Sequence, residues 1–222
     1  MPVNTLRANP FVFVGQRLWL DFVNTLGGSQ DAPEEMLRDA GALVRWLHAA
    51  GVLDAERSAG MLRRAQQQPA GATAALADAR RIRTVLRQLA EAGARDARVR
   101  RDVVAEINRV LGRSAGTRRL EEHGDGSFTR AFVPGGDAFA GLMIPIVESA
   151  ADALVQQELH RVRHCAARNC QRVFQDTTKN AARRWCDMTT CGNRAKADRY
   201  RRRIAGVKGI KVGSRINGVR VD

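Results

Sequence analysis

The chain has 222 residues, of which 44% are hydrophobic, so it is long enough for one or two domains and apolar enough for a packed core. It contains no run of about 18 apolar residues, which excludes a membrane-spanning helix of the usual kind. The first 30 residues lack the basic start and uninterrupted apolar stretch of a secretory signal, so we expect a cytoplasmic protein without a membrane partner.

The positive charge is concentrated in the C-terminal part of the chain. The net charge is +14, and residues 161–222 hold 17 lysines and arginines against 4 acidic residues. Residues 1–160 are nearly balanced, with 20 against 19. A local excess of this kind is typical of a surface that meets a polyanion, most often nucleic acid.

The first elements along the chain are a short β-prone run at residues 11–14 and a helix at residues 18–26, whose apolar residues have helical spacing. The polar residues Asp21 and Asn24 interrupt this apolar pattern. Two interpretations stay open for them: they hold neighbouring loops by hydrogen bonds, or they line a small-molecule pocket.

Helical patterns dominate the next hundred residues. Asp31, Pro33 and Glu34 form a helix start with a capping box, and Gly51 is suited to end that helix. Further helices are expected over residues 54–68, 72–92 and 103–111.

The period then changes from helical to β-type. Residues 117–122 and 127–133 flank a Gly-Asp-Gly turn and predict a β-hairpin. A long helix is expected over residues 138–164, capped by Asp137 and kinked at Pro145. It would lead straight into Cys165 and couple the two parts of the chain without a flexible linker.

The four cysteines of the chain form two pairs with the same internal spacing, Cys165 with Cys170 and Cys186 with Cys191. This pattern predicts a tetrahedral Zn²⁺ site with four thiolate ligands. Two disulfides or free buried thiols are the alternatives, and a reducing cytosol disfavours the disulfides. An iron–sulfur cluster ranks lower, because its usual three-cysteine run is missing.

A basic helix is expected to follow Cys191, with Thr189 or Thr190 as its cap. Ala197, Tyr200 and Ile204 share one narrow apolar face, and basic residues occupy the rest, which suits the major groove of DNA. The predicted nucleic-acid contacts are Lys179, Arg183, Arg184, Arg194, Lys196, Arg199, Arg202 and Arg203.

Two segments resemble known families. The segment from Trp185 to Lys196, with its Cys-x4-Cys-Gly-Asn-Arg core, and the upstream Cys165-x4-Cys170 are similar to the CGNR zinc finger. The segment from Leu18 to Thr25 resembles the opening motif of the ABATE domain, which usually precedes that finger. The resemblance covers almost the whole chain and implies a bacterial, stress-linked transcription regulator with a C-terminal DNA-binding finger.

We therefore expect a mainly α fold, with a helical ABATE-like domain that contains one β-hairpin over residues 1–160. A small treble-clef-like four-cysteine finger would span residues 161–205, followed by a basic tail over residues 206–222. We expect duplex DNA as partner, with a small-molecule effector and a homodimer as further expectations for the N-terminal domain. RNA binding, or ligand or protein binding with a purely structural finger, is the alternative.

Catalysis is not expected. The four histidines are dispersed along the chain, and no nucleophile and base stand at a recognisable spacing.

Overall fold

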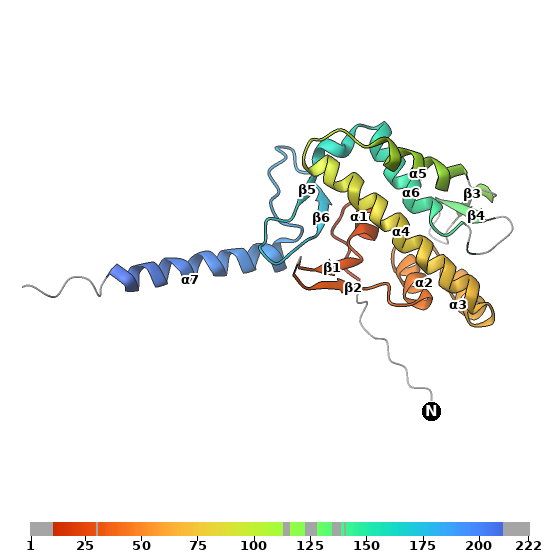
Figure 1. The fold of residues 1–222 in the computed structure, drawn as a ribbon, viewed down its shortest axis with the longest axis horizontal. Helices are drawn as coiled ribbons and strands as arrows, with labels where there is room; N and C mark the ends of the chain where they lie inside the picture. The colour runs from red at the N-terminus through yellow and green to blue at the C-terminus, as the bar shows by residue number, and fades with distance from the viewer. Residues whose placement is uncertain are drawn as a thin grey trace, which may run out of the picture.

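The computed structural model describes residues 11–29, 31–112, 116–122, 128–134, 139 and 141–210. In these ranges the fold is mainly α (Figure 1). The α-helices are α1 (Leu18–Val23), α2 (Ala40–Ala49), α3 (Ala55–Gln67), α4 (Pro69–Ala94), α5 (Arg101–Gly112), α6 (Ile144–Val155) and α7 (Asn193–Ile210). Three two-stranded antiparallel sheets pair β1 (Leu26–Gly28) with β2 (Pro33–Glu35), β3 (Gly116–Glu122) with β4 (Phe128–Pro134), and β5 (Val162–His164) with β6 (Val173–Gln175). None of the described helices combines the length and the apolar character that crossing a bilayer requires.

The helical body is built around α4, which contacts α1, α2, α3 and α5. Its buried residues Ala79, Ile82, Leu86 and Leu89 recur at helical spacing, so one stripe of the helix faces the core. Trp19 and Phe22 of α1 and Trp46 of α2 are the largest side chains of this core and are fully buried. Burial of an aromatic side chain of this size removes about 150–250 Å² from water, at about 25 cal/mol per Å², so each of these residues contributes several kcal/mol to the core.

The predicted helix start at Asp31 is wrong. Residues 33–35 form β2, which pairs with β1, and α2 begins only at Ala40. Its cap is Asp39, whose carboxylate accepts a hydrogen bond from the backbone N–H of Ala42 at 2.6 Å. The chain reverses at Gly28, whose φ of +81° is the left-handed conformation that glycine adopts without strain. The predicted strand at residues 11–14 is also absent from the structure, whereas the predicted first helix is present and ends at Val23.

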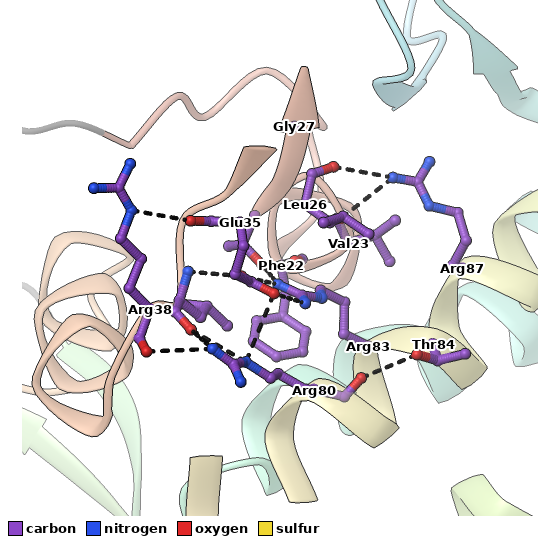
Figure 2. A network of polar contacts seen from close by, with 12 residues as sticks. Phe22, Val23, Leu26, Gly27, Glu35, Arg38, Arg80, Arg83, Thr84 and Arg87 are labelled. Carbon is purple, nitrogen blue, oxygen red and sulfur yellow. Dashed lines mark hydrogen bonds and ion pairs between the residues drawn. The ribbon is translucent and has the colours of Figure 1, made fainter. Parts of the chain in front are cut away.

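An ion pair between Glu35 of β2 and Arg83 of α4 holds this strand in place (Figure 2). Arg83 on α4 is 6% exposed, and its guanidinium donates to both carboxylate oxygens of Glu35 and, at 3.0 Å, to the hydroxyl of Thr25. Arg80, one turn earlier, donates to the carbonyl of Leu37. Burial acts to raise the pKa of Glu35, but the hydrogen bonds and charge of Arg83 outweigh it and hold that pKa below its usual range. The β1–β2 ribbon is thereby fixed to α4.

The predicted long helix over residues 138–164 is much shorter in the structure. α6 covers Ile144–Val155, and Pro145 stands in its first turn, where proline starts a helix instead of kinking it. Gln157 has a left-handed φ of +56°, which ends the helical path; a 3₁₀ turn (η1, Glu158–Arg161) and β5 follow. The predicted hairpin is confirmed as β3 and β4, while its turn at residues 123–127 and the cap Asp137 lie outside the described residues.

The helical body and the cysteine-bearing segment share one core. Val162 of β5 and Val173 of β6 are fully buried within the same hydrophobic cluster as Trp19 and Leu86. The Asn24 side chain forms two hydrogen bonds with the backbone of Val173, donating to its carbonyl at 2.8 Å and accepting from its N–H at 3.0 Å. The Asn24 side chain thus pairs with the backbone of β6 as a neighbouring strand would.

Asp21 and Arg87 strengthen the same junction. Asp21 accepts a hydrogen bond from the backbone N–H of Gly15 at 2.7 Å, and the carbonyl of Gly15 accepts one from Gln175 at 2.9 Å. Arg87 on α4 donates to the carbonyl of Gln171 at 2.9 Å. Asp21 and Asn24 thus hold neighbouring segments by hydrogen bonds, and their place in a small-molecule pocket stays a prediction.

Candidate metal centre and basic helix

The four cysteine side chains converge on one point. Their sulfur atoms all lie within 4.8 Å of one another, and the sulfur of Cys186 is 3.8 Å from that of Cys170 and 3.7 Å from that of Cys191. In a tetrahedral site with Zn–S bonds of about 2.3 Å, the sulfur atoms are about 3.8 Å apart. A disulfide would bring two sulfur atoms to about 2.05 Å, and all four cysteines are free. The geometry therefore fits a Zn²⁺ ion held by four thiolates.

The backbone around the thiols is organised to support negative charge on sulfur. The backbone N–H of Cys186 donates to the sulfur of Cys165 at 3.4 Å. Hydrogen bonds from the Cys170 and Cys186 thiols lower the pKa of Cys165, and the same bond to Cys165 raises the pKa of Cys170 to about 11. Four thiols this close cannot all ionise without a cation among them, and a divalent metal supplies that positive charge.

The first cysteine pair lies on a tight loop. Cys165 and Cys170 belong to the first loop, between β5 and β6, where the N–H of Cys165 donates to the carbonyl of Arg172 at 2.9 Å. The N–H of Ala166 donates to the carbonyl of Arg184 at 2.8 Å, which ties this loop to the segment before Cys186. We call residues 166–169, between the first two cysteines, the first knuckle.

A small apolar cluster separate from the main core surrounds the metal site. Phe174, fully buried, and Trp185, partly buried, pack here with the cysteines and with Val14. Trp185 and Phe174 thus belong to one small core around the metal site. A cluster of this size provides little burial energy, so metal binding supplies most of the folding free energy of this region.

Arg183 forms contacts within this scaffold, and its predicted role as a nucleic-acid contact stays a prediction. Its guanidinium lies 4.5 Å from the centre of the Phe174 ring and donates to the carbonyls of Trp185, at 3.0 Å, and Cys186. Lys179 and Arg184 are exposed, as that prediction requires, and the Arg184 guanidinium lies 5.3 Å from the centre of the Trp185 ring.

The start of the basic helix is tied to the metal site by its cap. A π-helical turn (η2, Met188–Gly192) carries Cys191 directly into α7. The cap is Asp187, not the predicted Thr189 or Thr190: its carboxylate accepts from the N–H of Thr190 at 2.7 Å and from both threonine hydroxyls. These bonds hold the pKa of Asp187 below its usual range, so the cap is charged at neutral pH. The amide of Asn193 donates to the carbonyl of Thr189 at 3.0 Å, which secures the passage into α7.

α7 leaves the body and extends away from it as a single straight helix (Figure 1). The predicted apolar face is present but does not dock on the described residues: Tyr200 is 60% and Ile204 39% exposed. The predicted contact residues on this helix are all exposed to solvent, namely Arg194, Lys196, Arg199, Arg202 and Arg203. In residues 193–204, the ion pair that the structure forms joins Arg201 to Asp198.

Sequence reasoning missed one feature of this region, a groove of about 750 Å³ between α7 and the first knuckle. Arg168 and Asn169 of the knuckle and Arg194 and Arg202 of α7 border it. Asp31, from the loop between β1 and β2, reaches its edge. The position of Arg168 between two metal ligands is visible in the sequence. Its closeness to α7 is not, because it depends on how the knuckle folds.

The comparisons with known families agree with this architecture. A family model described as "Putative stress-induced transcription regulator", ABATE, matches residues 16–157. The chain belongs to the ABATE family. A second family model, the CGNR zinc finger, matches residues 161–204. No curated protein matches the chain.

The two matches confirm the predicted family architecture and the predicted zinc cofactor. In the ABATE segment, the polar residues of the opening motif hold the finger in place, as Asn24 does at Val173. In the CGNR motif, the cysteine is a ligand, and a side chain at Gly192 would meet Met188 of the π-turn. The predicted boundaries at residues 160 and 205 stay predictions, and the two matched segments share one hydrophobic core.

Proposed function

We propose that this zinc-binding ABATE-family protein is a bacterial transcription regulator that binds duplex DNA through α7 and the metal site that carries it. The observation that supports the proposal most directly is α7 itself. The helix begins two residues after the metal ligand Cys191, extends into solvent, and exposes six basic side chains in its first three turns.

The physical argument rests on rigidity and charge together. A helix of about 10–12 Å diameter fits the major groove of B-DNA, and arginine pairs with guanine there through two hydrogen bonds. Because the zinc site and the Asp187 cap fix the first turn, the helix meets DNA in one orientation with little loss of conformational entropy. Lysine and arginine contacts to phosphate would supply most of the affinity.

The experiment is a selection of bound fragments from genomic DNA by the purified, zinc-loaded full chain, followed by affinity measurements across salt concentrations. We expect enrichment of specific fragments and a linear fall of log K with log salt, at about −0.9 per phosphate contact. Charge reversal of Arg199 and Arg203 to Glu should abolish binding, whereas Arg63→Glu on α3 of the body should leave it unchanged. Equal binding by both variants would contradict the proposal.

RNA binding is tested in the same assay by competition with single-stranded and structured RNA. Among the described residues of α7, Tyr200 is the one aromatic residue. Proteins that bind single strands generally stack bases on several aromatic side chains, so duplex DNA is the favoured partner. Stronger retention of RNA than of duplex DNA at equal salt would replace the DNA proposal with an RNA-binding function.

The proposal assigns no catalytic step to the chain, and it places the protein in the cytoplasm, where its DNA is. It gives the N-terminal part the task of holding the finger and of responding to an effector, with a homodimer as the form that would read a two-fold-symmetric site. Sedimentation of the protein with and without duplex tests the dimer.

A further inference from the structure

The groove between α7 and the first knuckle has the charge and the walls of a phosphate site. Among the described residues that border it are five arginines and two aspartates. One aspartate, Asp198, is paired with Arg201. The groove thus keeps a strong excess of guanidinium groups, which bind phosphate oxygens with two parallel hydrogen bonds.

Both walls are fixed by the same metal ion. The knuckle with Arg168 lies between the ligands Cys165 and Cys170, and α7 begins directly after the ligand Cys191. The separation of the walls is therefore set by the zinc site. A groove of fixed width between two arginine-bearing walls suits a regular, repeating anion, which is what a nucleic-acid backbone offers.

The groove occupies one face of α7. Arg194, Asp198 and Arg202 recur every four residues and lie on the groove side of the helix. At about 100° per residue, Lys196 and Arg203 lie roughly opposite to Arg194. The helix thus has one basic face directed to the knuckle and another directed away from it.

Asp31 brings the N-terminal part into the same groove. It follows β1 in the loop before β2, and β2 is fixed to α4 by the pairing of Glu35 with Arg83. The body thereby holds a carboxylate at the edge of a surface that is otherwise basic. Phosphate bound there would be repelled by Asp31.

We propose that this groove binds the sugar–phosphate backbone of the DNA duplex, with Arg168 and Asn169 of the first knuckle as a second wall beside α7. In the same proposal, Asp31 of the N-terminal part lowers the affinity. The inference rests on the proposed DNA binding and deepens it: α7 reads the major groove with one face while the knuckle and the other face clamp the adjacent strand.

Single-residue variants of the zinc-loaded full chain test this, with fluorescence anisotropy on a labelled duplex at several salt concentrations. Arg168→Ala should remove about one unit from the slope of log K against log salt, which is roughly a tenfold loss of affinity at 0.1 M salt. Asp31→Asn should raise the affinity, by about threefold, because it removes a partly screened repulsion. Arg98→Ala, at an exposed arginine of the body, is the control for Arg168→Ala because it also removes one positive charge. It should change neither the affinity nor the slope.

The two opposite signs separate binding from folding, because a misfolded variant does not gain affinity. Zinc content of about one ion per chain verifies that Arg168→Ala keeps the metal site. If Arg203→Ala, on the face of α7 away from the groove, weakens binding while Arg168→Ala and Asp31→Asn behave like Arg98→Ala, the groove proposal is overturned and the proposed DNA binding stands. If the unmodified chain shows no salt-dependent binding to duplex, the proposed function itself fails.

Discussion

Two arginine-rich helices of this chain use the same side chain in opposite ways. On α4, Arg80 and Arg83 bind Glu35 and nearby backbone, Arg81 pairs with Asp78, and Arg87 bonds to carbonyls. Each of these guanidinium groups is paired with another group of the protein, although Arg81 is exposed. On α7, the arginines of the first three turns are exposed, and the helix extends into solvent.

The comparison shows which arginines stabilise the fold and which are exposed for contact with a partner. α4 packs in the body, so each arginine on it lies beside a carboxylate or an unpaired carbonyl and satisfies it. α7 has a metal site at its start and few acidic neighbours, so its charge remains directed to solvent. Arginine content alone does not distinguish these two situations; the elements packed around each helix do.

Loss of the metal should produce the largest effect, and it should fall on α7. Cys186→Ser removes a buried ligand, and structural zinc contributes about 10–16 kcal/mol of apparent binding free energy in small fingers. We expect DNA binding to vanish, while α4 and the rest of the body keep most of their helicity by circular dichroism. Because Val173 and Asn24 join the two parts, the melting temperature of the body should also fall.

The matched control is Ser58→Cys, a buried serine on α3 of the body, which changes oxygen to sulfur without touching the metal site. An unchanged melting temperature of the body in Cys186→Ser would contradict the shared core and favour two independent folding units. Complete unfolding of the chain would instead make the zinc site essential to the body as well.

The second prediction sets one arginine of each helix against the other. Arg83→Met on α4 leaves the half-buried Glu35 carboxylate without its main partner, and losing hydrogen bonds to such a charged group costs about 1.5–3 kcal/mol of unfolding free energy. Arg80, whose Nε is 3.6 Å from Glu35, compensates in part, so we expect the lower end of that range. Arg203→Met on α7 should change stability by less than about 0.5 kcal/mol.

Urea unfolding followed by tryptophan fluorescence measures both variants, since Trp19 and Trp46 lie in the body. The double variant Arg83→Met with Glu35→Leu, which removes both charges, should recover part of the loss. Similar losses for Arg83→Met and Arg203→Met would erase the distinction between the two helices.

The metal site and the basic helix were readable from sequence because their signals are local. Two cysteine pairs of equal spacing and a run of arginines after the last cysteine are contiguous patterns. The mainly α fold followed from apolar periodicity in the same way, and α4 and the β3–β4 hairpin lie close to their predicted places.

The failures have non-local causes. Residues 31–35 carry a good helix-start signal, but the pairing of Glu35 with Arg83, 48 positions away, and the turn at Gly28 make them a strand instead. The stretch after Val155 continues an apolar pattern, but Val162 is recruited into β5 by pairing with β6.

Burial disfavours the charged form of the Asp21 carboxyl, and substitution of this residue should give the smallest of the expected effects. Burial raises the pKa of Asp21 to about 6, against the hydrogen bonds from Gly15 and Val14 that lower it. A carboxyl with a folded pKa above its unfolded pKa of 3.8 holds its proton more tightly when folded, so the native state loses stability as pH rises from about 4 to 6. Asp21→Asn keeps an oxygen for the N–H of Gly15 and removes the charge, so it should be more stable than the unmodified chain above pH 6, by on the order of 1 kcal/mol. The difference between the two proteins, measured by urea unfolding at pH 4, 5, 6 and 7, should grow with pH, and a difference that is constant over this range would show that burial does not shift this carboxyl.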